Sequence, residues 1–286
     1  MEINSRTKLT CLLGHPVKQS FSPQIHNYLF EKYNQNNIYT CFDTKAEELK
    51  NASQGIKSLG IEGCNVTIPH KINIIKYLDI VDENTKLIGA VNTIKNDNGN
   101  LIGYNTDGIG FVKSIIDKGY NLKDKRVMII GAGGACRSIS VELANSGVKS
   151  VEIRNRSLEK AKELLDLIEA NFNIETMYSN KEIKEKCLEN IDILINTTPI
   201  GMNSLECPID KKIILKKRIL VCDIVYKPHK TEFIKWAIDN DLSVIYGIDM
   251  LINQAIKAFE IWTNIKTTQD DIKEIKDIYF EHIEKK

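Results

Sequence analysis

Three features are missing from this sequence: an apolar run long enough to cross a membrane, a strong imbalance of charge, and closely spaced cysteines. No apolar stretch approaches the roughly 20 residues that a membrane span needs, and the run at 11–13 is too brief for a secretory signal. The 39 Lys and Arg residues nearly cancel the 38 Asp and Glu residues, leaving a net charge of +1. Such a chain has no global field for nucleic acid or anionic lipid. We therefore predict a cytoplasmic protein that binds anions only locally, with neither nucleic acid nor membrane as a partner.

The cysteines and histidines show no metal or disulfide pattern. The seven cysteines contain no CxxC pair, and the five histidines contain no HxxxH pair. Zinc sites and disulfide frameworks need such closely spaced sets. The sequence therefore predicts no bound metal and no disulfide framework.

The length and the order of the apolar segments predict an α/β protein. A chain of 286 residues, of which 42% are apolar, can form about two domains with substantial cores. In the first half, short apolar runs alternate with helical patterns, which predicts a mainly parallel sheet. The expected strands are 8–13, 38–42 and 63–67, the expected helices are 24–32, 46–59 and 72–78, and a hairpin is expected over 91–104.

The second half predicts a doubly wound sheet. Its strand segments are nearly continuous apolar runs, which is typical of a parallel sheet covered on both faces. These strands are expected at 126–130, 151–154, 191–195, 219–223 and 242–245. Two helices, at 249–264 and 268–284, close the chain without a strand between them, and they could return to cover the first domain.

A glycine-rich turn joins the strand at 126–130 to the next helix. The segment Gly131-Ala132-Gly133-Gly134-Ala135 presents backbone N–H groups and a helix N-terminus to a pyrophosphate, which a Cβ on the first two glycines would hold off. A tight turn without any nucleotide is the alternative. Its place in the middle of a doubly wound domain favours dinucleotide binding.

The end of the following strand indicates which dinucleotide is bound. An acidic residue there would bind the adenosine ribose and repel a 2′-phosphate, but this strand end reads Asn155, Arg156 and Ser157, with Lys160 one turn later. Because a guanidinium fork matches a phosphate, the sequence predicts NADP(H) rather than NAD. An exposed cationic strand end with a helix cap is the alternative, and Glu152 is the residue that could reverse the preference.

Polar residues follow the predicted strands of the first half, where open sheets bind ligands. Ser20 and Ser22 could both donate to one carboxylate, since the proline after Ser22 favours an extended chain, although either serine could instead cap a helix. Asn65 and Thr67 share one face of a strand, and Asn92 belongs to a further polar cluster.

Lys71 and Asp107 are the candidate proton-transfer pair. The sequence predicts Lys71 in the first turn of a helix, where the dipole disfavours an ammonium by about 0.3 to 1 kcal/mol, so another use is indicated. Asp107 could orient that amine, although an aspartate that begins a helix is ordinarily a cap. Only their combination with a nicotinamide site indicates redox chemistry.

These segments together resemble a known family. The strings GHPVKQSFSPQIHN, NVTIPHK, GAVNT, NTDG, GAGGA, NRS and GIDMLINQA are similar, in order and spacing, to motifs of the shikimate dehydrogenase family. The members of this family are NADPH-dependent reductases of 3-dehydroshikimate in aromatic amino-acid (chorismate) biosynthesis. The resemblance implies a substrate-binding, catalytic domain of residues 1–107 and 251–286, a Rossmann NADP-binding domain of residues 108–250, and a cleft between them.

The resemblance also implies roles for individual residues. Lys71 and Asp107 would form the catalytic pair. The substrate would be contacted by Ser20, Ser22, Asn65, Thr67, Lys71, Asn92, Asp107, Tyr226 and Gln254. NADP(H) would be contacted by Gly131, Ala132, Gly133, Gly134, Ala135, Asn155, Arg156, Ser157, Lys160, Thr197, Ile224, Gly247 and Met250.

The chain departs from the family pattern at a few positions. Phe21 stands where Lys is common, His70 where Phe is frequent, and Lys160 where an Arg often helps to hold the 2′-phosphate. Serine at both 20 and 22 favours shikimate over quinate. A quinate/shikimate dehydrogenase that uses NAD and a catalytically silent nucleotide sensor are the alternatives, and the cationic strand end disfavours a methyltransferase. We expect a monomer or a homodimer.

Overall fold

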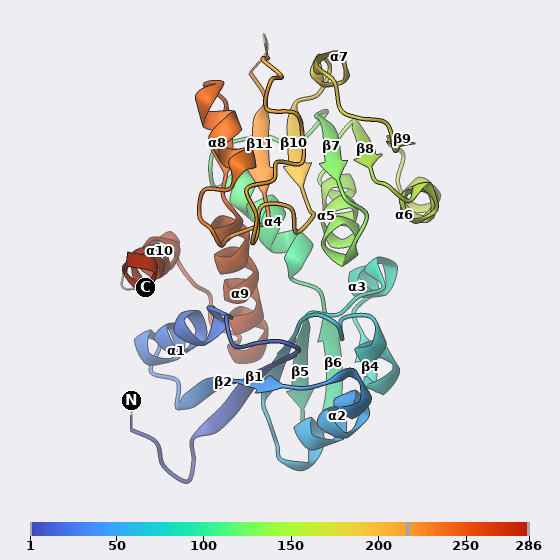
Figure 1. Ribbon diagram of the computed structural model, residues 1–286. Coiled ribbons are helices and arrows are strands. Elements are labelled where there is room, and N and C mark those ends of the chain that lie inside the picture. The colour runs from blue at the N-terminus through green and yellow to red at the C-terminus, as the bar shows by residue number, and fades with distance from the viewer. Residues whose placement is uncertain (1, 216–217, 285–286) are drawn as a thin grey trace. The chain divides into compact units, whose positions relative to one another are not determined.

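The computed structural model describes residues 2–215 and 218–284, and the chain divides into two units (Figure 1). The first unit combines the chain up to Thr106 with the chain from Ile252 onward, and the second unit is Asp107–Leu251. Each junction lies one residue from the domain boundary expected from the sequence. Asp107, expected with the first domain, begins the second unit.

The first unit is built on a six-stranded mixed sheet in the order β2-β1-β3-β5-β6-β4. β1 is parallel to β2 and β3, β5 is antiparallel to β3 and β6, and β4 is parallel to β6. The predicted hairpin is thus confirmed, and Asn98 and Gly99 at its turn have positive φ angles of 52° and 91°. The strands are β1 (Lys8–Gly14), β2 (Asn37–Asp43), β3 (Gly63–Val66), β4 (Ile80–Val81), β5 (Thr93–Asp97) and β6 (Asn100–Tyr104).

The helices of the first unit differ from the prediction in three places. The helix expected over 46–59 is a 3-10 turn, η1 (Ala46–Glu48), followed by α2 (Leu49–Ser58). The helix expected over 72–78 is a short 3-10 helix, η2 (Asn73–Tyr77). Strand β4 and helix α3 (Glu83–Ile88) were not predicted, because segments this short carry too few residues to show a periodicity. The other helices are α1 (Ser22–Lys32), α10 (Gln269–Glu284) and the end of α9 (Gly247–Thr263).

The last two helices pack on the first unit. The Trp262 indole of α9 donates a hydrogen bond to the carbonyl of Ile94 at 2.9 Å. The indole lies against the sheet at Gly63, where the absence of a side chain leaves room for the ring. Asp271 of α10 accepts from the Tyr33 hydroxyl at 2.7 Å and pairs with Lys32 of α1 at 2.8 Å. The helix pair therefore completes the core of the first unit.

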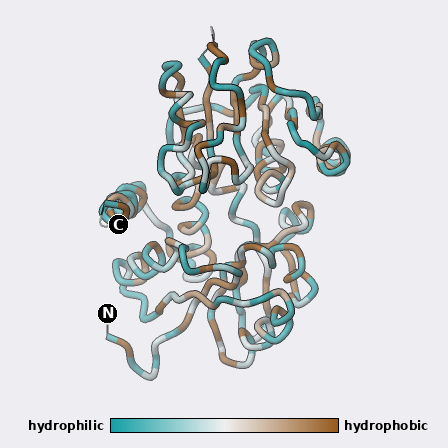
Figure 2. Tube along the Cα trace, in the orientation of Figure 1, coloured by the Kyte–Doolittle hydropathy of each residue, from teal (hydrophilic) through white to brown (hydrophobic). Residues whose placement is uncertain are grey.

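The second unit is a doubly wound parallel sheet, as predicted. Its order is β12-β11-β10-β7-β8-β9, and every pairing is parallel. Figure 2 shows hydrophobic residues along its strands, and the central strands β7 and β10 are almost wholly buried. Its strands are β7 (Arg126–Ile130), β8 (Ser150–Arg154), β9 (Glu175–Ser179), β10 (Ile193–Asn196), β11 (Leu220–Asp223) and β12 (Ser243–Ile245). Its helices are α4 (Asp107–Ile116), α5 (Gly134–Asn145), α6 (Leu158–Asn171), α7 (Glu185–Leu188), α8 (Glu232–Asp239) and the start of α9.

The described part of the chain was searched for membrane-spanning helices and for groups of metal-binding side chains. None of its helices has both the length and the apolar character that a membrane crossing requires. Within the same residues, no group of three or more His, Cys, Asp or Glu side chains is arranged to hold a metal ion.

Candidate active site

The predicted substrate residues of the first unit lie at one edge of its sheet. The carboxyl ends of β1, β3 and β6 meet there with the amino end of the antiparallel β5. Ser20 and Ser22 follow β1, Asn65 lies near the end of β3 with Thr67 directly after it, and Asn92 precedes β5. The mixed topology therefore brings together polar clusters that are far apart in the sequence.

A network of side-chain hydrogen bonds fixes the amides at this edge. Asn65 Nδ2 donates to the Asn92 carbonyl at 3.2 Å and to Thr93 Oγ1 at 3.1 Å. Asn92 Nδ2 donates to Thr106 Oγ1 at 3.0 Å and to Gln254 Oε1 at 3.4 Å. Asn92 Oδ1 accepts from the backbone N–H of Thr106 at 2.8 Å. Three of the predicted substrate residues, Asn65, Asn92 and Gln254, are thus joined through two threonines that the sequence reasoning did not select.

Tyr39 on β2 also belongs to this network. Its hydroxyl donates to Asn65 Oδ1 at 2.8 Å, and its side chain is buried. Burial raises the pKa of Tyr39 well above its usual value, with a smaller opposing effect from a hydrogen bond to Ser22. Sequence reasoning missed this residue because a tyrosine at an inward position of a strand is ordinarily part of the core.

Ser20 and Ser22 lie at the start of α1, and their local structure differs from the prediction. The stretch was expected to be extended, but Ser22 is the first residue of the helix, with Pro23 in its first turn, where proline is well tolerated. Ser20 Oγ accepts the backbone N–H of Ser22 at 3.2 Å. Phe21 is buried, and its ring packs edge-on against Tyr279 at a centroid distance of 5.3 Å.

Lys71 lies in a tightly held loop rather than in the first turn of an α-helix. It precedes η2, so the predicted dipole argument does not apply to it. Its carbonyl accepts the backbone N–H of Val91 at 2.8 Å, which ties it to the segment that carries Asn92. The preceding His70 is buried, and its Nε2 lies 2.7 Å from the Thr44 carbonyl. Lys71 is half-buried, and its position depends on this backbone.

Asp107 begins α4 in the second unit and is buried, with 6% of its surface exposed. Its neighbour Thr106 is held by Asn92 of the first unit. The next residue, Gly108, lies against α5, where a Cβ would come within 2.3 Å of the Ser138 carbonyl oxygen. Asp107 is therefore fixed between two well-anchored residues, at the point where the chain passes from one unit to the other.

The glycine turn of the second unit lies at the carboxyl edge of its sheet, at the switch point of the strand order. β7 pairs with both β8 and β10, and open α/β sheets bind ligands at such a point. Gly131 has a φ of +107°, and a Cβ there would lie 2.7 Å from Thr197 Oγ1. Around Gly133 and Gly134, by contrast, no described atom lies within 4 Å of where a Cβ would be.

Helix α5 begins at this turn with its N–H groups available. Within the described residues no side chain caps its N-terminus at Gly133, and its first turn contains no acidic residue. Cys136 is fully buried, which raises the pKa of its thiol to about 12. The turn fits a pyrophosphate, because the main chain is exposed on one side and closely packed on the other.

The end of β8 supports the predicted preference for a 2′-phosphate. Asn155 Nδ2 donates to the Ser157 carbonyl at 2.8 Å, which organises the turn. Ser157 takes the N-cap position of α6, yet within the described residues its side chain makes no capping hydrogen bond, and Arg156 is exposed. The carboxylate of Glu152 pairs with Arg154 at 2.5 Å. The acidic residue that could have reversed the preference is thus neutralised by a neighbour on its own strand.

The remaining predicted cofactor residues follow β10, β11 and β12 at the same edge. Thr197 Oγ1 donates to the Ile130 carbonyl at 2.8 Å, and Ile224 follows β11. Gly247 begins α9, where a Cβ would lie 2.6 Å from the Ile224 carbonyl oxygen, and Met250 is buried one turn later. Tyr226 is half-buried, and burial raises the pKa of its phenol.

One buried carboxylate at this edge was not predicted. Asp223 ends β11 and accepts from Thr231 Oγ1 at 2.7 Å, Asn196 Nδ2 at 3.0 Å and the backbone N–H of Val225 at 3.0 Å. Burial raises its pKa to about 6, and these hydrogen bonds oppose the shift. Asp223 therefore connects the loops that carry Thr197 and Ile224.

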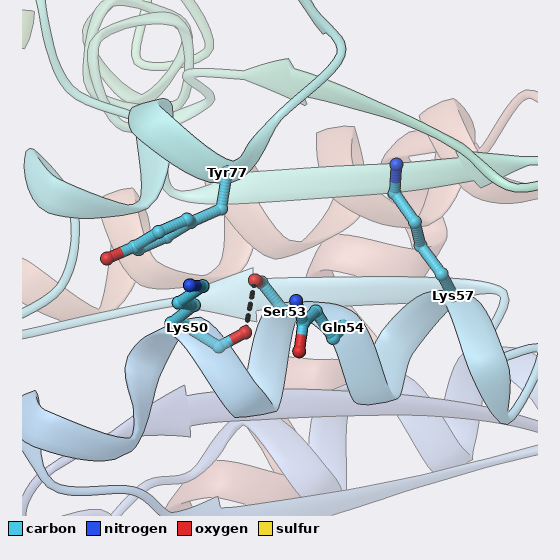
Figure 3. A pocket seen from close by; sticks show the side chains of 5 residues that line it. All are labelled: Lys50, Ser53, Gln54, Lys57 and Tyr77. Carbon is cyan, nitrogen blue, oxygen red and sulfur yellow. Dashed lines mark hydrogen bonds between the residues drawn. The ribbon is translucent and has the colours of Figure 1, made fainter.

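A separate pocket of about 340 Å³ lies between α2 and η2 of the first unit. Figure 3 shows its lining, which consists of Lys50, Ser53, Gln54, Lys57 and Tyr77. None of the predicted site residues lines it. Two of its polar side chains are already engaged, since Ser53 Oγ donates to the Lys50 carbonyl at 2.7 Å and Lys57 pairs with Asp79 at 2.7 Å. It is therefore not the candidate site.

Comparisons with known families match most of the chain. Residues 12–94 match the shikimate dehydrogenase substrate binding domain, residues 111–225 match shikimate/quinate 5-dehydrogenase, and residues 247–267 match the shikimate 5′-dehydrogenase C-terminal domain. The chain is also 46% identical over 265 residues to shikimate dehydrogenase (NADP(+)) of Caldanaerobacter subterraneus subsp. tengcongensis, covering 92% of this chain and 94% of that protein.

Two solved structures resemble the chain along its length. A crystal structure of shikimate dehydrogenase in complex with NADP+ is 40% identical, with a TM-score of 0.87 and 96% of each chain covered. Shikimate 5-dehydrogenase from Listeria monocytogenes, in complex with shikimate and NAD, is 34% identical, with a TM-score of 0.89 over 96% of this chain and 98% of that one.

Proposed function

The chain belongs to the shikimate dehydrogenase family, and from that premise we propose how its residues carry out the family's reaction. The protein catalyses the reversible, NADP(H)-dependent reduction of 3-dehydroshikimate to shikimate, a step of aromatic amino-acid biosynthesis. It is an oxidoreductase that acts on a CH–OH group. In this proposal the first unit binds the substrate and the second binds the cofactor. The observation that carries the proposal is the polar network at the first sheet edge, in which Thr106 directly precedes Asp107.

Lys71 and Asp107 are the proposed catalytic pair. When bound, NADPH supplies the hydride that reduces the substrate carbonyl. The ammonium of Lys71 donates the proton that the carbonyl oxygen takes up, and in the reverse direction the neutral amine accepts it. The carboxylate of Asp107 orients the amine. The backbone ties at Val91 and Thr106 support this assignment, because both restrict where the two side chains can lie.

The substrate is held by the side chains at the first sheet edge. Ser20 and Ser22 donate to its carboxylate, and the ring hydroxyls are contacted by Asn65, Thr67, Asn92 and Gln254. Tyr226, whose phenol keeps its proton, contacts the substrate from the second unit. Two serine donors suit the carboxylate of shikimate, and we propose shikimate rather than quinate as the preferred substrate.

The cofactor is held by main-chain groups at the glycine turn and by side chains after β8. Gly131 to Ala135 contact the pyrophosphate, while Asn155, Arg156, Ser157 and Lys160 contact the 2′-phosphate. Thr197, Ile224, Gly247 and Met250 line the nicotinamide side. The exposed guanidinium of Arg156 and the neutralised Glu152 support a preference for NADP over NAD.

The setting of the protein in the cell is a further part of the proposal. All seven cysteines, which lie in the described part of the chain, are free thiols, and this supports a reducing, cytoplasmic location. We propose a monomer or a homodimer without a nucleic-acid partner, since the net charge of +1 offers no field for one.

A steady-state assay with two cofactors and two polyols tests these assignments. Purified protein is mixed with NADP+ or NAD+ and with shikimate or quinate, and the absorbance of the reduced nicotinamide is followed. We expect the highest kcat/KM with NADP+ and shikimate. A lack of turnover with both cofactors would indicate a nucleotide sensor. A kcat/KM with NAD+ and quinate equal to that with NADP+ and shikimate would indicate the quinate/shikimate dehydrogenase.

Arg156→Ala tests the proposed cofactor preference. Removing a charge-assisted hydrogen bond to phosphate should lower kcat/KM for NADP+ about ten- to hundredfold and leave that for NAD+ nearly unchanged. Arg218→Ala, at another exposed arginine of the second unit, serves as the matched control. Equal losses with both cofactors would remove Arg156 from the 2′-phosphate site.

A further inference from the structure

A buried tyrosine of the first unit contacts a proposed substrate-binding residue, although the proposed reaction steps do not use it. We propose that Tyr39 is a positioning residue that fixes the amide of Asn65, so that Asn65 offers only its carbonyl oxygen to the substrate. This inference rests on the proposed role of Asn65 in substrate binding. It adds a residue from β2, a strand on which the sequence indicated no site residue.

The surroundings of Asn65 determine which way its amide faces. Its Nδ2 lies 3.2 Å from the backbone carbonyl of Asn92, a group that can only accept a hydrogen bond. The amide nitrogen must therefore face Asn92, and its second N–H is directed to Thr93 Oγ1 at 3.1 Å. Both donors of Asn65 are used within the network, and its carbonyl oxygen faces Tyr39.

Tyr39 is suited to hold that oxygen because its phenol remains a donor. Burial raises its pKa well above the usual value of a tyrosine, so it keeps its proton throughout the physiological range. The ring is also fixed. It stacks on His26 at a centroid distance of 4.4 Å and an interplanar angle of 19°. Burial lowers the pKa of His26 to about 3. This neighbour is therefore a neutral ring that places no charge beside the phenol.

The arrangement restricts what Asn65 can do for a ligand. An amide oxygen has two lone pairs, and the Tyr39 hydroxyl takes one of them at 2.8 Å. The remaining lone pair can accept from a hydroxyl of the substrate, while no N–H remains for a carbonyl or an ether oxygen. Without the Tyr39 hydroxyl the Asn65 oxygen loses its fixed partner, and the amide can turn away from this orientation.

Tyr39→Phe tests the inference, because it removes one oxygen and keeps the buried ring. Losing a hydrogen bond of this type should raise KM for shikimate about three- to tenfold. The kcat value should change less than twofold, and KM for NADP+ should stay the same. Tyr33→Phe is the matched control, since it removes a hydroxyl bonded to Asp271 at 2.7 Å elsewhere in the same unit. It should reproduce any loss of stability but not the rise in KM.

A double-mutant cycle separates the inference from the function on which it rests. If Tyr39 acts through Asn65, the effect of Tyr39→Phe on KM should fall by at least half, on a logarithmic scale, in the Asn65→Ala background. An effect of equal size in both backgrounds would overturn the positioning role, as would an unchanged KM in Tyr39→Phe alone. An unchanged KM in Asn65→Ala alone would instead remove Asn65 from the substrate site.

Discussion

The sheet edges of the two units present different kinds of groups. At the edge of the first unit, buried side chains bind one another, as in the contacts of Asn65 and Asn92. At the edge of the second unit the main groups are backbone N–H groups around Gly133 and Gly134, with open space beside them. Side-chain networks fix donors and acceptors individually, whereas a bare main chain fits any phosphate of suitable size. We therefore propose that the network, together with Ser20 and Ser22 beside it, sets the selectivity for the polyol.

The largest expected effect concerns Lys71 at the edge of the first sheet. Lys71 is held through its backbone, and its proposed task is to transfer a proton. Lys71→Met should lower kcat about 100- to 10,000-fold, the usual contribution of a positioned proton donor, with little change in KM for NADP+. Steady-state kinetics in both directions measure this.

Lys76→Met, in the neighbouring η2, is the control for the loss of a lysine. It should leave kcat within a factor of two. A Lys71→Met variant with near wild-type turnover would refute the catalytic assignment and leave the first edge as a binding site only.

Asp223 is the exception at the second edge, because there a side-chain network does organise the loops. Its pKa is raised from 3.8 to about 6 by burial, so the folded protein holds the proton more tightly than the unfolded chain. Its contribution to the free energy of unfolding is therefore complete below about pH 4 and is lost as the pH rises through 6. The linked loss is about 3 kcal/mol.

Urea unfolding of the wild type and of Asp223→Asn, at pH 4.5 and pH 7.5, measures this effect. The advantage of the wild type over the variant should shrink by about 2 to 3 kcal/mol at the higher pH. Thr231→Val, which removes a hydrogen bond to the ionised carboxylate, should make the pH dependence steeper. A difference that is the same at both pH values would contradict the raised pKa.

The two edges also differ in how far the sequence predicts them. The glycine turn is predicted well, because Gly131 to Ala135 are contiguous and follow a clear apolar strand. The network is predicted only in part. Asn65 and Asn92 stand out as polar residues at strand ends, but the roles of Tyr39 and Thr106 become visible only when the fold brings them beside Asn65 and Asn92. Pairing across distant segments is a tertiary property that local patterns do not carry.

The same difference explains why the segment around Lys71 was predicted as an α-helix. Its apolar residues Ile72, Ile74 and Ile75 suggest a helical period, but the segment is tied by backbone hydrogen bonds to Val91 and Leu101 and forms only the short η2. Five of the six strands in the doubly wound sheet of the second unit are predicted from their apolar runs, whereas the edge strand β9, whose residues are largely exposed, is not predicted. Tertiary contacts override local preference mainly where an element is short.

The smallest expected effect separates the two kinds of glycine in the second edge. Gly133 has φ −91° and ψ −172°, and no described atom lies within 4 Å of its would-be Cβ. Gly133→Val should therefore cost no more than about 1 kcal/mol of stability, through its N-cap position in α5, yet raise KM for NADP+ about tenfold or more by obstructing the phosphate. Gly131→Ala should instead lower the melting temperature, because its φ of +107° and its contact with Thr197 leave no room for a side chain. Thermal melts together with KM for both substrates distinguish these outcomes. If Gly133→Val kept its affinity for NADP+, the open main chain would not be the phosphate site, and the contrast between the two sheet edges would have to be abandoned.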